Sequence, residues 1–173
     1  EGGRVDVTAV AAELGEAEIL PGMANSKYHE GGSTFSPDGN VMYFTRNNYF
    51  QGRLNKGENG LVRLKTFQAE LVRNKWDNIT EMPFNSEDFS VGHPSLSPDG
   101  GTIYFVSDMT GGEGGTDIWM AKKQGEGWGK PENMGPRINT PGNDMFPWVS
   151  PTGVFYFCSN GHPGLGGLDL FRV

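Results

Sequence analysis

The tetrapeptide Ser-Pro-Asp-Gly occurs twice in this 173-residue chain and nearly recurs a third time. It stands at residues 36–39 and 97–100, and the third copy, at 150–153, has Thr152 in place of the Asp. Pro presets φ, Gly tolerates positive φ and Asp can bond its own backbone, so the tetrapeptide is typical of a tight turn between two strands. A turn that recurs along a chain indicates an internally repeated fold.

The flanks of these turns repeat as well. A short strand precedes each turn, and a strand with adjacent aromatic residues follows each turn. The strands predicted before the turns are 33–35, 94–96 and 147–149, and those predicted after them are 41–44, 103–105 and 155–157.

A third strand follows a glycine-rich loop in each repeat, and a fourth strand follows in the first two repeats. Four short strands per repeat are the pattern of propeller blades. We therefore predict an all-β fold, a β-propeller of four-stranded antiparallel blades with about three blades present. The predicted third strands are 61–64, 117–120 and 169–171, and the predicted fourth strands are 76–82 and 132–138.

The repeat also sets the predicted boundaries of the blades. Residues 20–36 align without a gap to residues 134–150, which places Asn25 on Asn139. The predicted units are the end of a preceding blade at 5–24, complete blades at 27–84 and 88–138, and an incomplete blade at 143–173.

In this scheme the preceding blade contributes a third strand at 5–10 and a fourth strand near Ile19. Propellers typically close with four to eight blades, and an open arc leaves bare sheet edges. We therefore expect the ring to be incomplete in these residues and to be completed by more chain or by another copy.

Charge and composition exclude several functional classes. The chain has 14 Lys and Arg against 21 Asp and Glu, for a net charge of −7, which argues against a nucleic-acid partner. The single cysteine, Cys158, cannot form an internal disulfide. No apolar run approaches the 18 or so residues of a membrane span, so we expect none.

The sequence favours a non-catalytic chain. Ser36, Ser97 and Ser150 recur at one position of the repeat, which marks them as turn residues, and the G-x-S-x-G motif of hydrolases is absent. We expect no catalytic residue, no cofactor and no metal. The alternative is the propeller portion of a hydrolase, either a peptidase or a glycan-active enzyme. The acidic, glycine-rich stretch 108–117 could offer oxygens to Ca²⁺, but it lacks the regular spacing of calcium loops, so we favour a flexible loop.

Topology suggests where a partner would bind. If the Ser-Pro-Asp-Gly turns lie at one rim, the opposite rim carries the loops between blades and those between second and third strands. Aromatic side chains among polar groups are what an interface requires. The alternative is that several of these aromatics pack between blades. The predicted partner-binding rim consists of Tyr28, His29, Asn47, Tyr49, Phe50, Asp108, Asp144, Phe146 and His162.

Several longer strings carry a resemblance to a known family. They are K-Y-H-E at 27–30, Y-F-T-R-N-N-Y-F at 43–50, F-N-S-E-D at 84–88, W-G-K-P-E-N-M-G-P-R-I-N-T at 128–140 and G-H-P-G-L-G-G-L-D-L-F at 161–171. On these strings the chain resembles the WD-repeat-like, Pro-Asp-motif propellers of the TolB-like type. In particular it is similar to the propeller region of outer-membrane-associated proteins of the OmpA family.

The resemblance implies a periplasmic, outer-membrane-associated scaffold that binds protein or peptide partners in the cell envelope. Some relatives act in secretion, notably in the type IX system. Peptidoglycan is bound in that family by a separate domain, so we expect peptidoglycan binding only through a domain absent from these residues. The first blade departs from the pattern, because Gly60-Leu61 stands where the other blades have Asp117 and Asp169.

Overall fold

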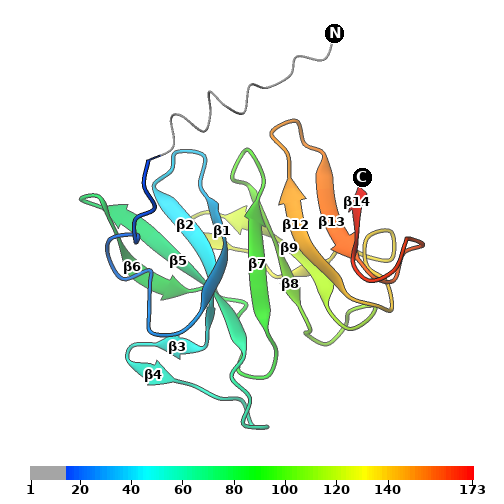
Figure 1. The fold of residues 1–173 in the computed structure, drawn as a ribbon, viewed down its shortest axis with the longest axis horizontal. Coiled ribbons are helices and arrows are strands. Elements are labelled where there is room, and N and C mark those ends of the chain that lie inside the picture. The colour runs from blue at the N-terminus through cyan, green and yellow to red at the C-terminus, as the bar shows by residue number, and fades with distance from the viewer. Residues whose placement is uncertain (1–14) are drawn as a thin grey trace.

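The computed structural model describes residues 15–173, so the strand expected at 5–10 lies outside the described residues. Three larger antiparallel sheets stand side by side, with a small two-stranded sheet below the first (Figure 1). The expected all-β class is confirmed. In the part described, the three sheets do not close into a ring. No helix among residues 15–173 is long and apolar enough to cross a membrane.

Sheet 1 has the strand order β1-β2-β5-β6. Its third strand starts later than predicted, at Leu64 rather than Leu61, because it must run alongside β2, whose last residue, Asn47, pairs with Leu64. The loop between β2 and β5 contains the two-stranded sheet. The strands are β1 Glu30–Phe35, β2 Val41–Asn47, β3 Tyr49–Phe50, β4 Arg53–Leu54, β5 Leu64–Val72 and β6 Lys75–Glu81.

Sheet 2 has the order β10-β9-β8-β7, and β11 also pairs with β9. Its fourth strand is shorter than the predicted 132–138. Gly135 has φ 73° and Pro136 lacks a backbone N–H, so the strand cannot continue past them. The strands are β7 Val91–Leu96, β8 Thr102–Ser107, β9 Asp117–Gln124, β10 Gly127–Trp128 and β11 Glu132–Asn133.

Sheet 3 has three strands, in the order β12-β13-β14. They are β12 Asp144–Val149, β13 Phe155–Ser159 and β14 Asp169–Arg172. These strands overlap the predicted ones, but β12 starts three residues before the predicted 147–149. The fourth strand of the preceding blade, expected near Ile19, does not form. Residues 15–20 have no regular secondary structure, and Gly22 makes only an isolated bridge with Trp76.

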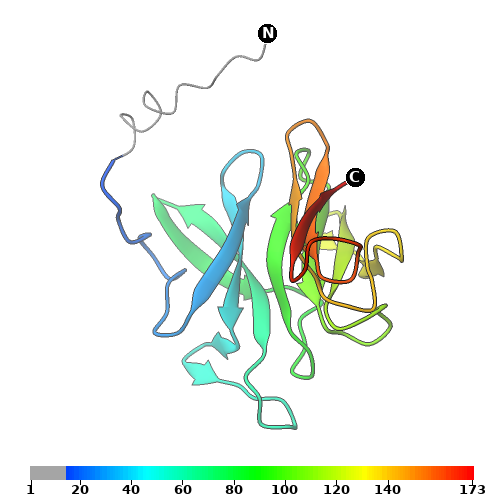
Figure 2. The same cartoon turned by 45° about the vertical axis from the view of Figure 1, so that its right-hand side comes forward.

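In sheets 2 and 3 the first strand packs against the sheet before it. β7 contacts β1, β2 and β5, and β12 contacts β7, β8 and β9. As a result β1, β7 and β12 lie next to one another across the centre of the molecule, coloured blue, green and orange (Figure 1; Figure 2). Each joint between sheets therefore has the same construction.

Side chains from alternate strand residues fill the space between neighbouring sheets. Side chains of successive strand residues point to opposite faces. In β8, Ile103 and Phe105 are fully buried in the cluster toward sheet 1, whereas Tyr104 and Val106 belong to the cluster toward sheet 3. Sheet 2 is thus covered on both faces.

The Ser-Pro-Asp-Gly turns form as predicted. In the first turn the Ser36 hydroxyl donates to Asp38 Oδ1 at 2.5 Å and accepts the Val41 N–H at 2.9 Å. These bonds from Ser36 and from Asn40 lower the pKa of Asp38 to about 2. Gly39 adopts φ 72°, which explains the glycine. The serine hydroxyl is therefore a part of the turn.

Candidate functional site

Lys27, Tyr28 and Tyr49 form a cluster at one rim of sheet 1. The ring centroids of Tyr28 and Tyr49 are 4.9 Å apart. Lys27 Nζ lies 5.4 Å from the Tyr28 centroid and 5.6 Å from the Tyr49 centroid. A cation at this distance is attracted to the negative face of an aromatic ring. The three side chains hold one another in place, and we call them the Tyr–Lys cluster.

The β3–β4 hairpin positions Tyr49. The hairpin turns at Gly52, where φ is 81°. Phe50, the next residue of β3, packs with its ring centroid 5.7 Å from that of the fully buried Phe67. Phe50 therefore anchors the hairpin on the core, and Tyr49 remains half-exposed at the rim.

A pocket of about 630 Å³ opens beside the Tyr–Lys cluster, and we call it the rim pocket. Its lining combines aromatic, amide and cationic side chains and contains no Asp or Glu. With two cations and no carboxylate in its lining, the pocket suits an anionic group better than a cationic one. The lining residues are Gly22, Met23, Asn25, Ser26, Lys27, Arg46, Tyr49, Phe50, Gln51, Gly52, Asn78 and Ile79.

The two cations of the rim pocket have different roles. Arg46 is buried, with Nε 3.2 Å from Glu30 Oε1, and its guanidinium also donates to the carbonyls of Met23 and Ala24. Burial lowers the pKa of Arg46, and the charge of Glu30 opposes that shift. Lys27 is exposed and forms no ion pair within residues 15–173. Lys27 is thus the cation available to a partner.

His29 and Asn47 join the segment before β1 to the end of β2. Asn47 Oδ1 accepts the His29 N–H at 3.3 Å, and the Asn47 N–H donates to the His29 carbonyl at 3.3 Å. The His29 side chain is exposed. The structure therefore brings Tyr49 and Phe50 to one pocket and packs Tyr28 against Tyr49 beside it. His29 and Asn47 stand next to these residues in the chain.

Asp108 links sheets 1 and 2. Its Oδ1 accepts the Ser90 N–H at 2.6 Å, and its Oδ2 lies 3.5 Å from Arg63 Nη1. Asp108 is exposed, so water and salt screen this ion pair. It remains accessible, but it does not line the rim pocket.

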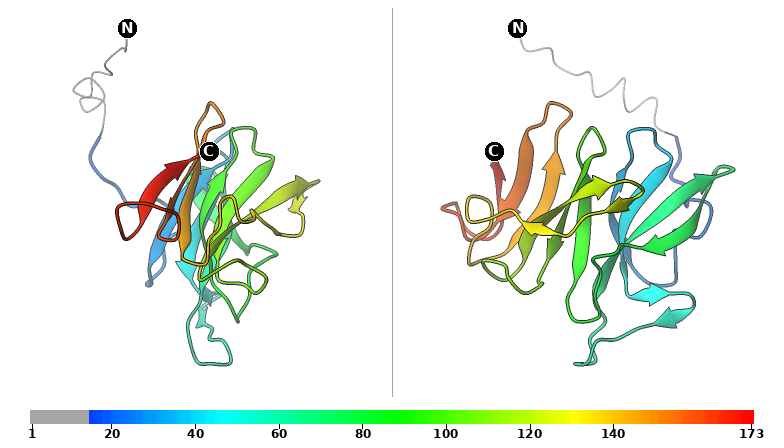
Figure 3. Two further views of the ribbon diagram at one scale, coloured as in Figure 1. Left: turned by 90° about the vertical axis from the view of Figure 1, so that its right-hand side faces the viewer. Right: turned by 180° about the vertical axis from the view of Figure 1, so that it is seen from behind.

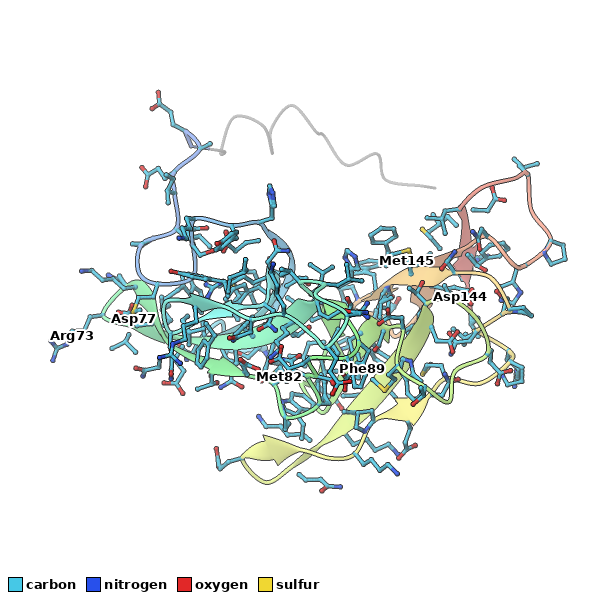
Figure 4. The ribbon with its side chains drawn as sticks, turned by 90° about the horizontal axis from the view of Figure 1, so that it is seen from below. Arg73, Asp77, Met82, Phe89, Asp144 and Met145 are labelled. Carbon is cyan, nitrogen blue, oxygen red and sulfur yellow. The ribbon has the colours of Figure 1, made fainter. Side chains whose placement is uncertain are left out.

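Asp144 and His162 were expected at the partner-binding rim, but the structure buries Asp144 and packs the ring of His162 against sheet 3. Asp144 is 0% exposed at the start of β12 (Figure 4), and its Oδ2 accepts the N–H and the hydroxyl of Thr140 at 2.6 and 3.0 Å. Burial prevents contact with a partner. The half-buried His162 places Nε2 2.9 Å from the Ile138 carbonyl and its ring 5.2 Å from that of Phe171, so it packs sheet 3.

Phe146 lies in a bulge of β12 and does not line the rim pocket. The ladder with β13 shifts register between Met145 and Trp148, and Phe146 has φ 55°. β7 and β1 have equivalent bulges, with φ 52° at His93 and 46° at Gly32. A bulge redirects a side chain, and a positive φ strains any residue except Gly. The repeated bulge aims one position of each first strand at a common place.

That place is a groove of about 430 Å³ lined only by first strands, which we call the inner groove. The rings of His93 and Phe146 meet there, with centroids 4.6 Å apart. Burial lowers the pKa of His93. No Asp, Glu, Lys or Arg lines the groove, whose residues are Gly32, Ser33, Thr34, Phe35, His93, Pro94, Ser95, Phe146, Pro147 and Trp148.

Sequence reasoning missed Lys27 and His93. Lys27 stands next to Tyr28, but its position over two rings depends on the hairpin that brings Tyr49 near. His93 had a readable signal, because Gly32, His93 and Phe146 each stand four residues before the serine of a turn.

The stretch 108–117 folds around a carboxylate. Asp117 Oδ2 accepts the Glu113 N–H and a bond of 3.0 Å from Asn133 Nδ2. Asp169 has the same role, because its Oδ2 accepts the Leu165 N–H at 2.7 Å. Among residues 15–173, no group of three or more His, Cys, Asp or Glu residues could hold a metal ion.

No protein-family model and no curated protein matches this chain. Solved β-propeller chains do resemble it, among them the following two. A TolB-like chain from Agrobacterium tumefaciens is 20% identical with a TM-score of 0.52, over 87% of this chain and 51% of that one. A puromycin-hydrolyzing peptidase from Mycobacterium tuberculosis is 17% identical with a TM-score of 0.51, over 83% of this chain and 20% of that one. The chain thus spans about half and one fifth of these chains, and identities this low show the fold alone.

Proposed function

We propose that this chain is part of a non-catalytic β-propeller that binds a protein or peptide partner through the rim pocket. The observation that carries the proposal is the Tyr–Lys cluster beside that pocket. Tyr side chains offer large contact areas at low entropic cost, and interface hot spots are rich in them. The exposed Lys27 adds a charge that no group within residues 15–173 neutralises.

The propeller assignment is supported by the repeated joints between sheets. The first strands lie together at the centre, and those of sheets 2 and 3 pack on the preceding sheet. The likeness to the TolB-like chain agrees with this arrangement. On this assignment each of the three larger sheets is a blade, the last with three strands.

The cell-envelope setting rests on the resemblance of the sequence strings to OmpA-family propellers. We propose a periplasmic, outer-membrane-associated scaffold, with a role in secretion such as the type IX system. The chemistry of the rim pocket narrows the partner further. A segment bearing a carboxylate beside an apolar side chain would meet Lys27 with its charge and the two tyrosines with its apolar part.

Affinity capture from an envelope extract tests the proposal. The wild-type chain and the variants Lys27→Glu and Tyr49→Ala serve as baits, and bound proteins are quantified by mass spectrometry. We expect both variants to lose the proteins that the wild type captures. The affinity for an identified partner should fall about tenfold or more, because these residues lie at the centre of the contact.

Lys122→Glu is the matched control. Lys122 is exposed in β9 of sheet 2 and does not line the rim pocket. This variant makes the same change of charge on another sheet and should capture the wild-type set. Equal capture by Lys27→Glu and wild type would contradict the proposal.

The alternative from the sequence is the propeller portion of a hydrolase. It is tested on the same protein with peptide-amide and glycan substrates. Turnover that follows the protein through purification and survives Lys27→Glu would favour the alternative over a binding module.

A further inference from the structure

The rim pocket has a counterpart on the next sheet. A pocket of about 580 Å³ is lined by the connection from sheet 1 to sheet 2 and by the loop that follows β8. We call it the sheet 2 pocket. Figure 3 shows this connection and the β3–β4 hairpin at the same end of the molecule, opposite the turns between first and second strands. Both pockets therefore lie at the same rim.

The two pockets are lined by equivalent positions of the repeat. Each contains an Asn-Ser dipeptide from the segment before the first strand. Each also contains two residues of the loop after the second strand and two residues in the fourth strand or just before it. The register of the paired strands fixes these equivalences. The corresponding pairs are 25–26 and 85–86, 49–50 and 110–111, and 78–79 and 130–131.

The sheet 2 pocket keeps the chemistry of the rim pocket with different residues. Phe89, Met109 and Trp119 supply its apolar surface. Its one cation is Lys130, which is exposed and forms no ion pair in the described part of the chain. No Asp or Glu lines the pocket. Like the rim pocket, it suits an anionic group attached to an apolar one.

The walls of the sheet 2 pocket are held rigidly. The Phe84 ring stacks on the fully buried Phe105, with centroids 4.3 Å apart and planes 6° apart. Asn85 Oδ1 accepts the Thr66 N–H at 3.1 Å, and Asn85 Nδ2 donates to the Thr66 carbonyl at 2.7 Å. These contacts tie the connection to sheet 1 and to the core. A site that is already ordered costs little conformational entropy on binding.

Trp119 provides an unused hydrogen-bond donor. Its side chain lines the pocket and is 6% exposed, and its Nε1 is buried with no acceptor among residues 15–173. A buried indole N–H usually has a partner, because leaving it without one costs free energy. A ligand that carries an oxygen beside an apolar group would supply the acceptor.

We propose that the sheet 2 pocket is a second binding site for the partner and takes a carboxylate beside an aromatic side chain. Lys130 meets the carboxylate, Phe89 and Met109 pack on the ring, and the Trp119 N–H donates to an oxygen of the ligand. The inference rests on the proposed function, which assigns the same chemistry to the rim pocket. A partner that fills both pockets gains affinity from each.

The indole N–H signal of Trp119 tests the proposal. The chain has four tryptophans, and their indole signals are assigned in the full-length, ¹⁵N-labelled chain. N-acetylphenylalanine, which carries a ring and a carboxylate, is the probe. The Trp119 signal should move downfield and saturate in the millimolar range, as expected for so small a ligand. The amide of the same compound, which lacks the charge, should bind at least about fivefold more weakly.

Lys130→Glu should weaken binding of the probe at this site by about tenfold or more, because it replaces the only cation of the pocket with an anion. Lys122→Glu is the matched control, since Lys122 is exposed on the same sheet outside the pocket, and it should bind like the wild type. A Trp119 signal that does not move, or equal binding by Lys130→Glu and wild type, would overturn the proposal. Trp119 and Lys130 do not line the rim pocket, so this failure would leave the proposed function standing.

A two-unit peptide tests whether one partner can fill both pockets. Two Phe-Glu units are joined by Gly-Ser linkers of increasing length and compared with a peptide that has one unit. At the linker length that spans the pockets, the two-unit peptide should bind at least about tenfold more tightly. Lys27→Glu and Lys130→Glu should each remove this gain. The absence of a gain at every length would contradict a shared partner.

Discussion

The third strands of sheets 1 and 2 carry opposite charges at one position of the register, near the start of each strand. Lys65 pairs with Arg46 of β2, and Asp117 pairs with Ser107 of β8 at the equivalent place in the register. Both are buried, at 4% and 2% exposure. A repeated fold thus accepts a cation or an anion at this position.

The neighbours explain how both are accepted. Lys65 Nζ lies 3.0 Å from Glu81 and 2.7 Å from Glu87, and these bonds outweigh burial, so its pKa is raised. Asp117 instead takes backbone N–H and amide donors, among them Asn133, which stands at the register position of Glu81. A buried charge needs a partner of the opposite polarity, and each sheet supplies its own.

This difference changes the loop before the strand. In sheet 2 the loop folds tightly onto Asp117. In sheet 1 no carboxylate accepts backbone N–H groups from the loop before β5, and the chain there forms the β3–β4 hairpin that carries Tyr49. The rim pocket therefore lies on the sheet that departs from the repeat.

Exchanging the charges should have the largest effect. Asp117→Lys buries a cation among donors, and we expect a loss of about 4 kcal/mol of unfolding free energy. Urea denaturation of the purified chain measures it. The double variant Asp117→Lys with Asn133→Glu rebuilds the sheet 1 pair and should recover about 1 kcal/mol or more. No recovery would show that the two positions are not equivalent.

Gly112→Ala should cost about 2–3 kcal/mol, because a Cβ at Gly112 would overlap Asp117 Oδ2. The control is Gly31→Ala in sheet 1, where a Cβ meets nothing within 4 Å and the change should stay within about 0.5 kcal/mol. Thermal unfolding of both variants makes the comparison. Equal effects would mean that the loop does not close on the carboxylate.

Lys65→Met should cost about 2 kcal/mol, less than Asp117→Lys, because Glu81 and Glu87 can turn toward water once their partner is gone. The exposed Lys56 provides the control Lys56→Met, for which no measurable change is expected. Chemical denaturation with urea at neutral pH distinguishes them. A loss as large as that of Asp117→Lys would indicate that the glutamates are held in place.

The smallest expected effect on stability comes from the first strands, where sheet 1 has Gly32 and sheet 2 has His93 at the same position. Burial lowers the pKa of His93 below its unfolded value of about 6.5, so the folded state favours the neutral ring. Its contribution is present above pH 6.5 and is lost as the pH falls through the lower folded pKa.

The denaturation midpoint of the wild type should therefore fall more between pH 7 and pH 5 than that of His93→Asn. The exposed His29 gives the control variant His29→Asn, which should keep the dependence of the wild type. An unchanged pH profile in His93→Asn would show that the ring is not buried in solution.

The parts of the fold that depend on neighbours in sequence were predictable. Ser36 and Asp38 build their turn from bonds within a few residues, and the strands on either side follow from alternation. The third strand of sheet 1 was misplaced because its start depends on Asn47 of another strand. Of the residues predicted for the partner-binding rim, the structure brings Tyr28 and Tyr49 into contact, whereas Asp144 is buried.

By itself the sequence determined the repeat, the turns and the all-β class, because turn chemistry and strand alternation act over a few residues. Tertiary structure alone decided which aromatic side chain reaches the rim and which reaches the inner groove. Tyr49 and Phe146 look alike in the sequence, but one is carried by a hairpin anchored on Phe67 and the other by a bulge facing His93. Packing between sheets makes that choice, since burial depends on residues distant in the chain.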